Sequence, residues 1–558
     1  MPTSRTTAPT APRWPGWGAG RSATFSPWER LFFAAIGVAI VVSGWLWVGA
    51  HVSSRIWSGR WLDLSFAEML PIAVEAMSHP SDATSAFGAE AAAQLPGPAV
   101  FWAITMLLGL LPAVGVSRLV LRRSARRRRD EPTVARWATK RDLKPLIVRR
   151  PTPGRLTIGR GPSGRLLAAE PGHSLLVLGP TQSGKTSGLA IPAILEWPGP
   201  VVATSVKNDL LAATLDARRE RGTVWTYDPT GSVTGVPHAG WSPLANCHTW
   251  SGALRTASWL SRAARSKDLQ ESDFWFANAA KLLAPLLFAA ATAGMTMADV
   301  VRWVDLQEKT EVRLLLEAAG IAEALAAAEA SWNREDRTKS SIYTTTETIL
   351  SAFADPVVAA SARECDIIPE QLLDGGAHSL YICAPLHEQA RLRPLFTALV
   401  QHVLAVAYEQ AALRGKLDPP LLLVLDEAAN IAPLRDLDQI ASTAAGLGIQ
   451  LVTIWQDRAQ IVARYGQRAA TVVNNHRAKL LLSGITDVGT TGDFSQVIGD
   501  TEIHRQSTTF DAEGRMSATH AEHVRPLASS AVLRQLQAFE GVLVYGRFRP
   551  TRVSLEAS

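Results

Sequence analysis

The chain has 558 residues, a formal net charge of +6, three cysteines and a hydrophobic content of 47%. This length is too great for one simple core and indicates two to four domains, and the hydrophobic content points to membrane segments on a globular body. The cysteines lie far apart and form no Cys-x-x-Cys pair, which argues against a disulfide framework or a zinc site. We therefore expect the body of the chain in the reducing cytoplasm.

Two apolar segments near the N-terminus are each long enough to cross a bilayer as a helix. Residues 1–27 are rich in Pro, Thr and Gly and are expected to form a disordered tail. In the membrane anchor that we predict at 28–121, the uncharged run 31–50 and the run 99–121 have the length of spanning helices, with a loop over 51–97 between them. A cleaved signal peptide is disfavoured, because the first run is long and begins thirty residues into the chain.

Basic residues lie on both flanks of this anchor. Between positions 118 and 165 there are 16 Lys and Arg against 3 Asp and Glu, so the basic excess is local and the rest of the chain is net acidic. In the juxtamembrane segment 122–165, the cluster Arg126–Arg129 either sets the topology or binds anionic lipid or DNA. The positive-inside rule predicts that both termini and the globular body are cytoplasmic.

The most specific motif is a phosphate-binding loop, G-x-x-x-x-G-K-[ST], preceded by the strand-like run 174–178 and followed by the helix-like run 187–196. The glycines let backbone N–H groups turn inward around phosphates, and the helix N-terminus adds a partial positive charge. Lys185 would reach the β- and γ-phosphates, and the Thr186 hydroxyl would bind Mg²⁺. The residues predicted to bind nucleotide are Gly179, Pro180, Thr181, Gln182, Ser183, Gly184, Lys185 and Thr186.

Strand-like runs alternate with helix-compatible segments on both sides of a stretch rich in Ala and Leu. This order predicts a parallel sheet in a nucleotide-binding domain of two parts, 166–248 and 361–558, with an all-α domain inserted at 249–360. The expected strands are 201–204, 223–227, 378–383, 421–425, 449–455, 478–482 and 541–545, with a hairpin from 156–160 and 164–168 and helices at 279–291 and 312–330.

A second apolar strand ends in two acids, Asp426 and Glu427. A buried parallel strand delivers its last residues to the carboxyl edge of the sheet, beside the phosphate loop. Asp426 would then lie in the second coordination shell of Mg²⁺, as in a Walker B motif, and Glu427 would polarise the attacking water. Gln456, which follows the strand 449–455, would sense the γ-phosphate or the water, or would simply cap the strand. Lys207, near another strand tip, would contact nucleotide or DNA, or would be a plain surface lysine.

In combination these motifs resemble the type IV secretion coupling proteins of the conjugative TraG/TraD class. The resemblance covers residues from about 31 to 550, and its landmarks are Leu178–Thr186, Ile191-Pro192, Trp197-Pro198-Gly199, Val206–Leu210, Tyr227-Asp228-Pro229, Asp426–Asn430, Trp455–Asp457, Gln460 and Tyr465-Gly466. It implies an α/β fold: a RecA-like P-loop NTPase domain with an inserted all-α domain, preceded by two N-terminal transmembrane helices. The inserted domain would face the incoming substrate.

The same resemblance implies a function. A member of this class would be an ATPase that uses ATP and Mg²⁺, forms a homo-hexamer when active and lies in the bacterial inner membrane. It would recruit DNA, expected to be single-stranded, or a DNA–relaxase complex, and would drive its transfer through the type IV secretion channel. Because the body is net acidic, DNA contacts must be local.

The sequence departs from the family pattern at two places. Relatives often carry an acid two residues before the lysine that follows the second strand, where this chain has Ser205. Relatives also often carry an arginine finger shortly before the sensor strand, whereas residues 443–446 contain no basic residue. Arg458, Arg464 and Arg477 are the remaining candidates, and Arg477, near a strand start, is preferred. A finger can contribute roughly 10³–10⁵ in rate, so its absence would predict a slow or partner-activated ATPase.

Two other functions stay open at this point. One is a double-stranded DNA pump of the FtsK type, a class that usually has more membrane spans and a C-terminal winged-helix domain. The sequence leaves about ten residues after its last predicted strand, too few for such a domain. The other is a membrane-anchored receptor that binds nucleotide for assembly and hydrolyses little of it.

Overall fold

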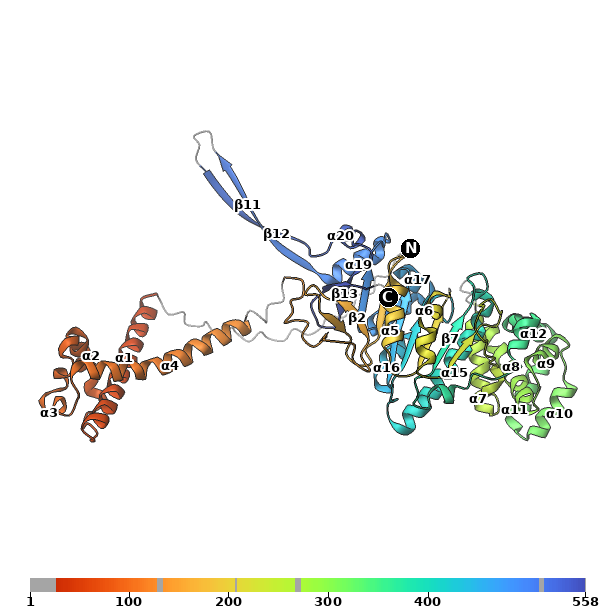
Figure 1. Cartoon of the computed structure of the whole chain (residues 1–558), viewed down its shortest axis with the longest axis horizontal. Coiled ribbons are helices and arrows are strands. Elements are labelled where there is room, and N and C mark those ends of the chain that lie inside the picture. Colours follow the sequence, from red (N-terminus) through yellow and green to blue (C-terminus); the bar gives the residue numbers. More distant parts are fainter. Residues whose placement is uncertain (1–26, 128–133, 206–207, 266–271, 511–515, 557–558) are drawn as a thin grey trace, which may run out of the picture. The chain divides into compact units, whose positions relative to one another are not determined.

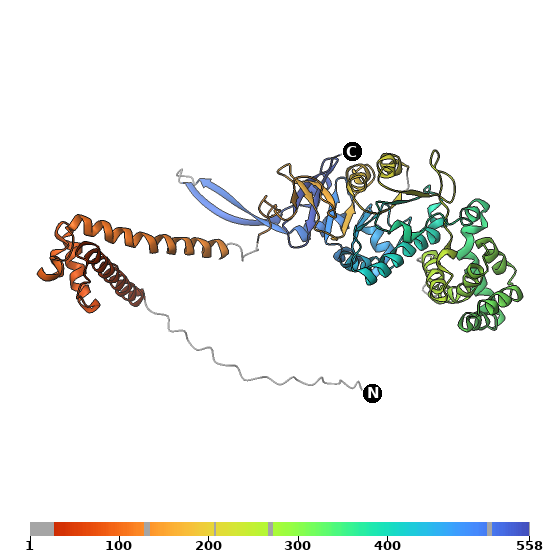
Figure 2. The same cartoon turned by 60° about the horizontal axis from the view of Figure 1, so that its bottom comes forward.

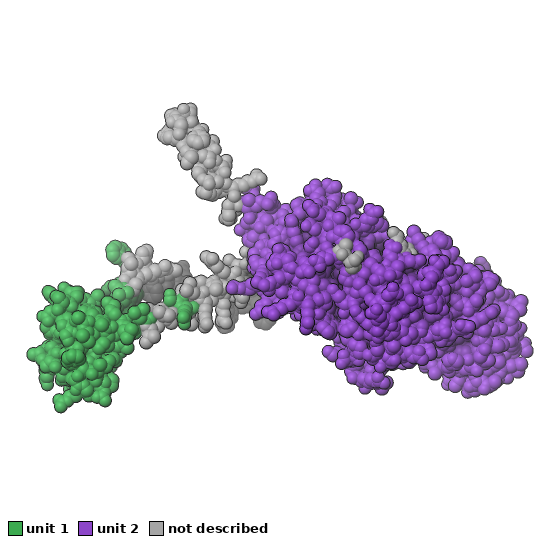
Figure 3. All heavy atoms as spheres, in the orientation of Figure 1, with its two compact units in different colours: residues 1–132 green, residues 133–558 purple. Residues whose placement is uncertain are grey.

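The structure is a computed structural model that describes residues 27–127, 134–205, 208–265, 272–510 and 516–556. It divides into two compact units, residues 1–132 and 133–558 (Figure 3). Each unit is described by itself below. The predicted disordered tail lies almost entirely outside the described residues.

The first unit is a small helical body in which two long helices, α1 (Pro27–Trp57) and α4 (Pro98–Arg127), pack against each other. Their close approach uses two glycines: a Cβ on Gly49 would lie 2.4 Å from the Thr105 hydroxyl, and one on Gly109 would lie 2.6 Å from Nε1 of Trp45. The segment predicted as a connecting loop is instead largely helical. It contains η1 (Phe66–Glu68), α2 (Met69–Ser78), η2 (Pro80–Asp82), η3 (Ser85–Phe87) and α3 (Ala89–Ala92).

Among the described residues, two helices are long and apolar enough to cross a membrane. The first, Ala35–Trp57, overlaps the first predicted span, and only 22% of its apolar window is buried. The second, Asp273–Thr292, was not predicted as a span; 67% of its apolar window is buried among neighbouring helices, as in the core helix of a soluble domain. The second predicted span falls on α4, a helix of 30 residues whose described apolar part, Pro98–Leu110, is shorter.

The second unit is built on one mixed sheet of twelve strands, in the order β1-β3-β2-β14-β13-β10-β4-β9-β8-β5-β7-β6 (Figures 1 and 2). From β10 to β6 all neighbouring strands are parallel, and the remaining pairs are antiparallel. The strands are β1 (Ile147–Val148), β2 (Thr157–Arg160), β3 (Leu166–Ala168), β4 (Leu175–Leu178), β5 (Val201–Ser205), β6 (Val224–Tyr227), β7 (Ser379–Cys383), β8 (Leu421–Leu425), β9 (Ile449–Trp455), β10 (Ala478–Leu482), β13 (Glu540–Tyr545) and β14 (Thr551–Ser554).

Helices cover both faces of the parallel part, and alternate residues of each strand pack on opposite faces. In β8, Leu422 and Val424 share a core with α5 (Ile191–Glu196) and α6 (Asp209–Arg219). Leu421, Leu423 and Leu425 share the other core with α15 (Gln389–Arg414) and α16 (Leu437–Leu447). The remaining helices of the sheet region are η4 (Thr186–Ala190), η5 (Pro243–Asn246), α14 (Pro369–Leu372), α17 (Arg458–Tyr465), η7 (Gly466–Arg468), α18 (Ala469–Asn475), α19 (Val488–Ile498) and α20 (Ser530–Arg534).

The region predicted to be all-α is helical throughout its described residues and gathers at one end of the second unit (Figures 1 and 2). The predicted single helix at 312–330 is wrong: it is two helices, because Gly320 ends α10 in the left-handed conformation, with φ 73°. The helices are α7 (Trp250–Ala264), α8 (Ser272–Thr292), α9 (Met297–Asp305), α10 (Thr310–Ala319), α11 (Ala322–Trp332), α12 (Asp336–Leu350), η6 (Ser351–Ala354) and α13 (Pro356–Ser361).

The longest strands of the described chain were not predicted. Strands β11 (Asp500–Phe510) and β12 (Met516–Pro526) form a long antiparallel hairpin that is separate from the main sheet. Polar and charged residues dominate both strands, so the sequence shows no alternation of apolar and polar residues that would mark a half-buried strand.

Candidate nucleotide-binding and hydrolysis site

The predicted site residues meet at the carboxyl edge of the parallel strands. Leu178, the last residue of β4, pairs with Trp455 of β9, and Leu425 of β8 pairs with Thr204 of β5. The residues that follow these strands therefore lie side by side, and together they line a cavity of about 500 Å³. Its walls include Thr181, Gln182, Gly184, Lys185, Thr186, Asp426, Glu427 and Gln456, and also Ser205, Asp209 and Asn430, for which the sequence predicted no catalytic role.

The phosphate loop has the tight turn that its glycines permit. Gln182 and Gly184 both have positive φ, 65° and 89°. A Cβ on Gly184 would lie 2.7 Å from the ring of Phe539, so glycine is required there for space as well as for conformation. The loop leads directly into η4, a π-helical turn that starts at Thr186. Such turns are rare and often lie at functional sites.

The ammonium group of Lys185 lies at the centre of the loop. Its Nζ donates hydrogen bonds to the carbonyl oxygens of Gly179, at 2.5 Å, and Pro180, at 2.8 Å. Burial lowers the pKa of Lys185, and the nearby charges of Asp426 and Glu427 oppose this effect. The lysine therefore brings a positive charge to a cavity whose opposite wall carries two acids.

Thr186 and Asp426 bring two oxygen-bearing side chains together at the cavity. The Thr186 hydroxyl donates to Oδ2 of Asp426 at 3.1 Å, and the Asp426 backbone oxygen accepts from the Thr204 hydroxyl at 2.9 Å. Burial raises the pKa of Asp426, while the Thr186 hydrogen bond and the Lys185 charge lower it. Mg²⁺ typically takes one or two carboxylates together with water and substrate phosphates, so this hydroxyl and carboxylate fit that ion. Among the described residues no group of three or more His, Cys, Asp or Glu forms an all-protein metal cage.

Glu427 is held by two amide side chains. It has a positive φ of 55°, and its Oε2 accepts a hydrogen bond from Nδ2 of Asn430 at 2.9 Å. Its Oε1 accepts a longer bond, 3.4 Å, from Nε2 of Gln456. The carboxylate is thereby oriented at the end of β8, beside Asp426. The sequence marked Asn430 only as the end of the landmark Asp426–Asn430 and gave it no role, although it lies three positions after Glu427.

The proposed arginine fingers lie elsewhere. Arg477 is exposed before β10, whose first residue pairs with Leu175, so it lies at the amino edge of the sheet, opposite the phosphate loop. Arg458 pairs with Asp493 at 2.8 Å, and Arg464 donates to the Pro433 carbonyl at 3.5 Å. None of the three is among the described residues that line the cavity. A role on a neighbouring subunit stays a prediction, and Lys207 lies outside the described residues.

Comparisons with known proteins show which family and which fold the chain resembles. The family described as "Type IV secretory system Conjugative DNA transfer" matches residues 136–554. The chain is 25% identical over 474 residues to a conjugal transfer protein TraG of Escherichia coli, covering 75% of this chain and 73% of that protein. Its fold is similar to that of the bacterial conjugative coupling protein TrwBdeltaN70, with a TM-score of 0.60 and 22% identity over 76% of this chain and 93% of that one. A structure of TrwB in complex with ADP and Mg²⁺ gives a TM-score of 0.58 at 22% identity, over 76% and 94% of the two chains.

Proposed function

The chain belongs to the type IV secretory system conjugative DNA transfer family, and we propose that it is the ATP-hydrolysing coupling protein that drives DNA into the secretion channel. Nucleotide binding and a part in conjugative DNA transfer follow from this membership and from the likeness to a coupling protein. Hydrolysis and its use for transport are our proposal. The observation that carries it is the convergence of Lys185, Thr186, Asp426 and Glu427 on one cavity.

Each of these residues has a defined task in the proposed reaction. Lys185 binds the β- and γ-phosphates, and the loop N–H groups cradle them. Glu427 accepts a proton from the water that attacks the γ-phosphorus, a new P–O bond forms, and the bond to the β-phosphate oxygen breaks to release ADP and phosphate. Gln456 helps to position the water and Glu427. Mg²⁺, bound by the Thr186 hydroxyl and oriented by Asp426, would neutralise the charge on the phosphates.

The helical first unit would place this ATPase at a membrane. We propose that α1 and α4 both span the bacterial inner membrane, with the two termini and the second unit in the cytoplasm. The apolar helix Ala35–Trp57 and the exposed hydrophobic side chains along α1 support the first span. The partners would be single-stranded DNA, a relaxase or relaxosome protein and components of the secretion channel, and the active form would be a homo-hexamer.

Two other functions, a DNA pump of the FtsK type and a nucleotide-binding receptor, are the alternatives to the coupling ATPase. The family match and the coupling-protein fold favour conjugative transfer over an FtsK-type pump. A receptor that binds nucleotide with little turnover stays open, because residues 443–446 contain no arginine finger. The ATPase and the receptor differ in hydrolysis rate, so the rate decides between them.

The test is ATP hydrolysis by the full chain in lipid nanodiscs, with and without single-stranded DNA. We expect hydrolysis by the wild type that Lys185→Ala abolishes. Lys479→Ala is the matched control: Lys479 is also partly buried, with its Nζ bonded to the His476 carbonyl at 2.7 Å, but it does not line the cavity. Equal rates in the wild type and Lys185→Ala, with or without DNA, would refute the ATPase and leave the receptor.

A further inference from the structure

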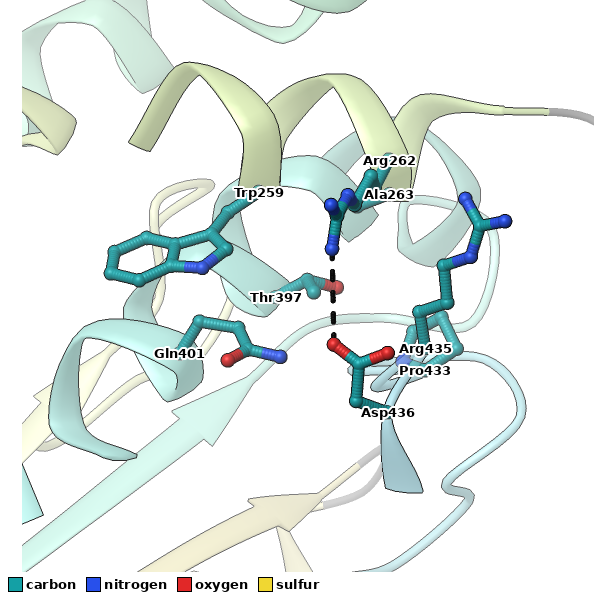
Figure 4. A pocket seen from close by; sticks show the side chains of 8 residues that line it. All are labelled: Trp259, Arg262, Ala263, Thr397, Gln401, Pro433, Arg435 and Asp436. Carbon is teal, nitrogen blue, oxygen red and sulfur yellow. Dashed lines mark ion pairs between the residues drawn. The ribbon is translucent and has the colours of Figure 1, made fainter. Parts of the chain in front are cut away.

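A second pocket lies where the loop 430–436, which follows Glu427, meets α7 and α15. Figure 4 shows Arg262 of α7 reaching toward Asp436, with Arg435 beside it. Nη1 of Arg262 is 3.8 Å from Oδ2 of Asp436, a loose ion pair between half-exposed side chains. The Thr397 hydroxyl also lines this pocket, and it is buried without a hydrogen-bond partner among the described residues. The pocket therefore holds polar groups that the protein itself leaves incompletely paired.

Positive charge is concentrated around this loop. In the described part of the chain, Arg393, Arg435 and Arg464 have no carboxylate within ion-pair distance. Arg393 and Arg464 instead donate to loop carbonyls, those of Asn430 at 3.4 Å and Pro433 at 3.5 Å. Burial lowers the pKa of both guanidinium groups, and the charges of Arg393 and Arg435 lower that of Arg464 further. Of these three arginines only Arg435 lines the pocket, where Asp436 is the one acid among the described lining residues. Arg393 and Arg464 lie behind the loop, and their charges make its surroundings more positive.

A polar stripe on α15 connects the pocket with the hydrolysis site. Arg393, Thr397 and Gln401 are four residues apart along a helix that is mostly buried, so they share one face. At one end of the stripe Arg393 bonds the Asn430 carbonyl, and at the other end Thr397 and Gln401 line the pocket. The Asn430 side chain in turn holds Glu427 at 2.9 Å. The loop that begins beside Glu427 thus ends at the pocket.

We propose that this arginine pocket, lined by Trp259, Arg262, Thr397, Gln401, Arg435 and Asp436, binds the backbone of the DNA strand being transferred, an inference that rests on the proposed function. A strand phosphate would replace the carboxylate of Asp436 in its loose pair with Arg262. Guanidinium groups bind phosphate oxygens in a bidentate fork, and Arg262 and Arg435 come from two different elements around one pocket. Thr397 and Gln401 supply further donors.

The indole of Trp259 decides between ligands. It lies in the same pocket as the arginines (Figure 4), and an aromatic ring beside basic groups is the usual platform for stacking an unpaired base. A single DNA strand presents a phosphate and an unpaired base at every nucleotide, whereas an acidic peptide presents a stacking group only where its sequence contains one. A DNA strand bound in the pocket contacts the loop 430–436. Because this loop carries Asn430, which holds Glu427, DNA binding is coupled to the position of Glu427.

The test measures the affinity of the full chain in nanodiscs for a fluorescent oligo-dT strand at several salt concentrations, without nucleotide. We expect the double variant Arg262→Ala, Arg435→Ala to bind about tenfold more weakly or worse. The slope of log affinity against log salt should become shallower by roughly 0.7 for each phosphate that the variant no longer neutralises. Trp259→Ala should lower the affinity with the slope unchanged, because stacking releases no counter-ions.

Arg255→Ala is the matched control. Arg255 lies on the same helix as Arg262, is exposed to a similar extent (45% against 47%) and also pairs with one acid, Glu409. This variant should bind the strand as the wild type does. Arg435→Lys, which keeps the charge, should bind the strand more tightly than Arg435→Ala. A melting curve of each variant checks that it is folded.

Wild-type affinity and slope in the double variant would overturn the proposal, as would an equal loss of affinity in Arg255→Ala. Loss of binding to a poly-glutamate peptide, with DNA binding intact, would overturn it in favour of a peptide site. Because the affinity is measured without nucleotide, each of these results is independent of whether the chain hydrolyses ATP.

Discussion

Replacing Glu427 by Gln tests the proposed hydrolysis most directly, because it removes the charge and keeps the shape. In the structure, the two carboxylate oxygens accept hydrogen bonds from Asn430 at 2.9 Å and from Gln456 at 3.4 Å. The oxygen of the new amide can keep the shorter bond, and Gln456 can rotate its own amide to present an oxygen to the new NH₂ group. The substitution removes at most one weak hydrogen bond, about 0.5–1.5 kcal/mol, so Glu427→Gln should fold.

The catalytic effect should be much larger than this structural one. Loss of a general base typically lowers the rate by about 10²–10⁴, which corresponds to roughly 3–5 kcal/mol in the barrier. Nucleotide affinity should stay at the wild-type value, since Lys185 and the loop N–H groups bind the phosphates. Phosphate release under saturating ATP measures the first effect, and titration with a fluorescent ATP analogue measures the second. A folded Glu427→Gln variant that hydrolyses ATP at the wild-type rate would refute the assignment of Glu427 as the base.

Two further predictions concern the same cavity. Gly184→Ala should lower the free energy of unfolding by about 1–2 kcal/mol because of the left-handed backbone alone, and its methyl group would also meet the Phe539 ring. The melting temperature and the nucleotide affinity should therefore both fall. An unchanged affinity would contradict this prediction. Because burial raises the pKa of Asp426, this group's own contribution to the stability of the fold decreases as the pH rises above about 4. Without nucleotide and Mg²⁺, the Asp426→Asn variant should therefore melt at a higher temperature than the wild type near neutral pH. This difference in melting temperature should become smaller toward about pH 4. An equal difference at both pH values would contradict the prediction.

Short, strongly patterned elements could be predicted from the sequence. The bounds of β8, β9 and β10 agree with the predicted 421–425, 449–455 and 478–482, because each is a compact apolar run between polar segments. Prediction failed where the local pattern carries little information. The hairpin β11–β12 has no apolar face, and the helices between α1 and α4 are too short to show a clear period.

The sequence by itself determined the chemistry of the phosphate loop, because Gly179, Gly184, Lys185 and Thr186 act through local spacing and local backbone geometry. The sequence also predicted Asp426, Glu427 and Gln456 beside this loop, but only the tertiary structure decided which of their atoms meet. Asp426 lies 240 positions from Thr186 and is bonded to it at 3.1 Å, because β4 and β8 both flank β9 in the sheet. The tertiary structure also showed that Asn430 is the partner of Glu427 and that α7 packs beside the loop 430–436 at the arginine pocket. Strand order and helix packing follow from long-range burial, which no local residue pattern encodes.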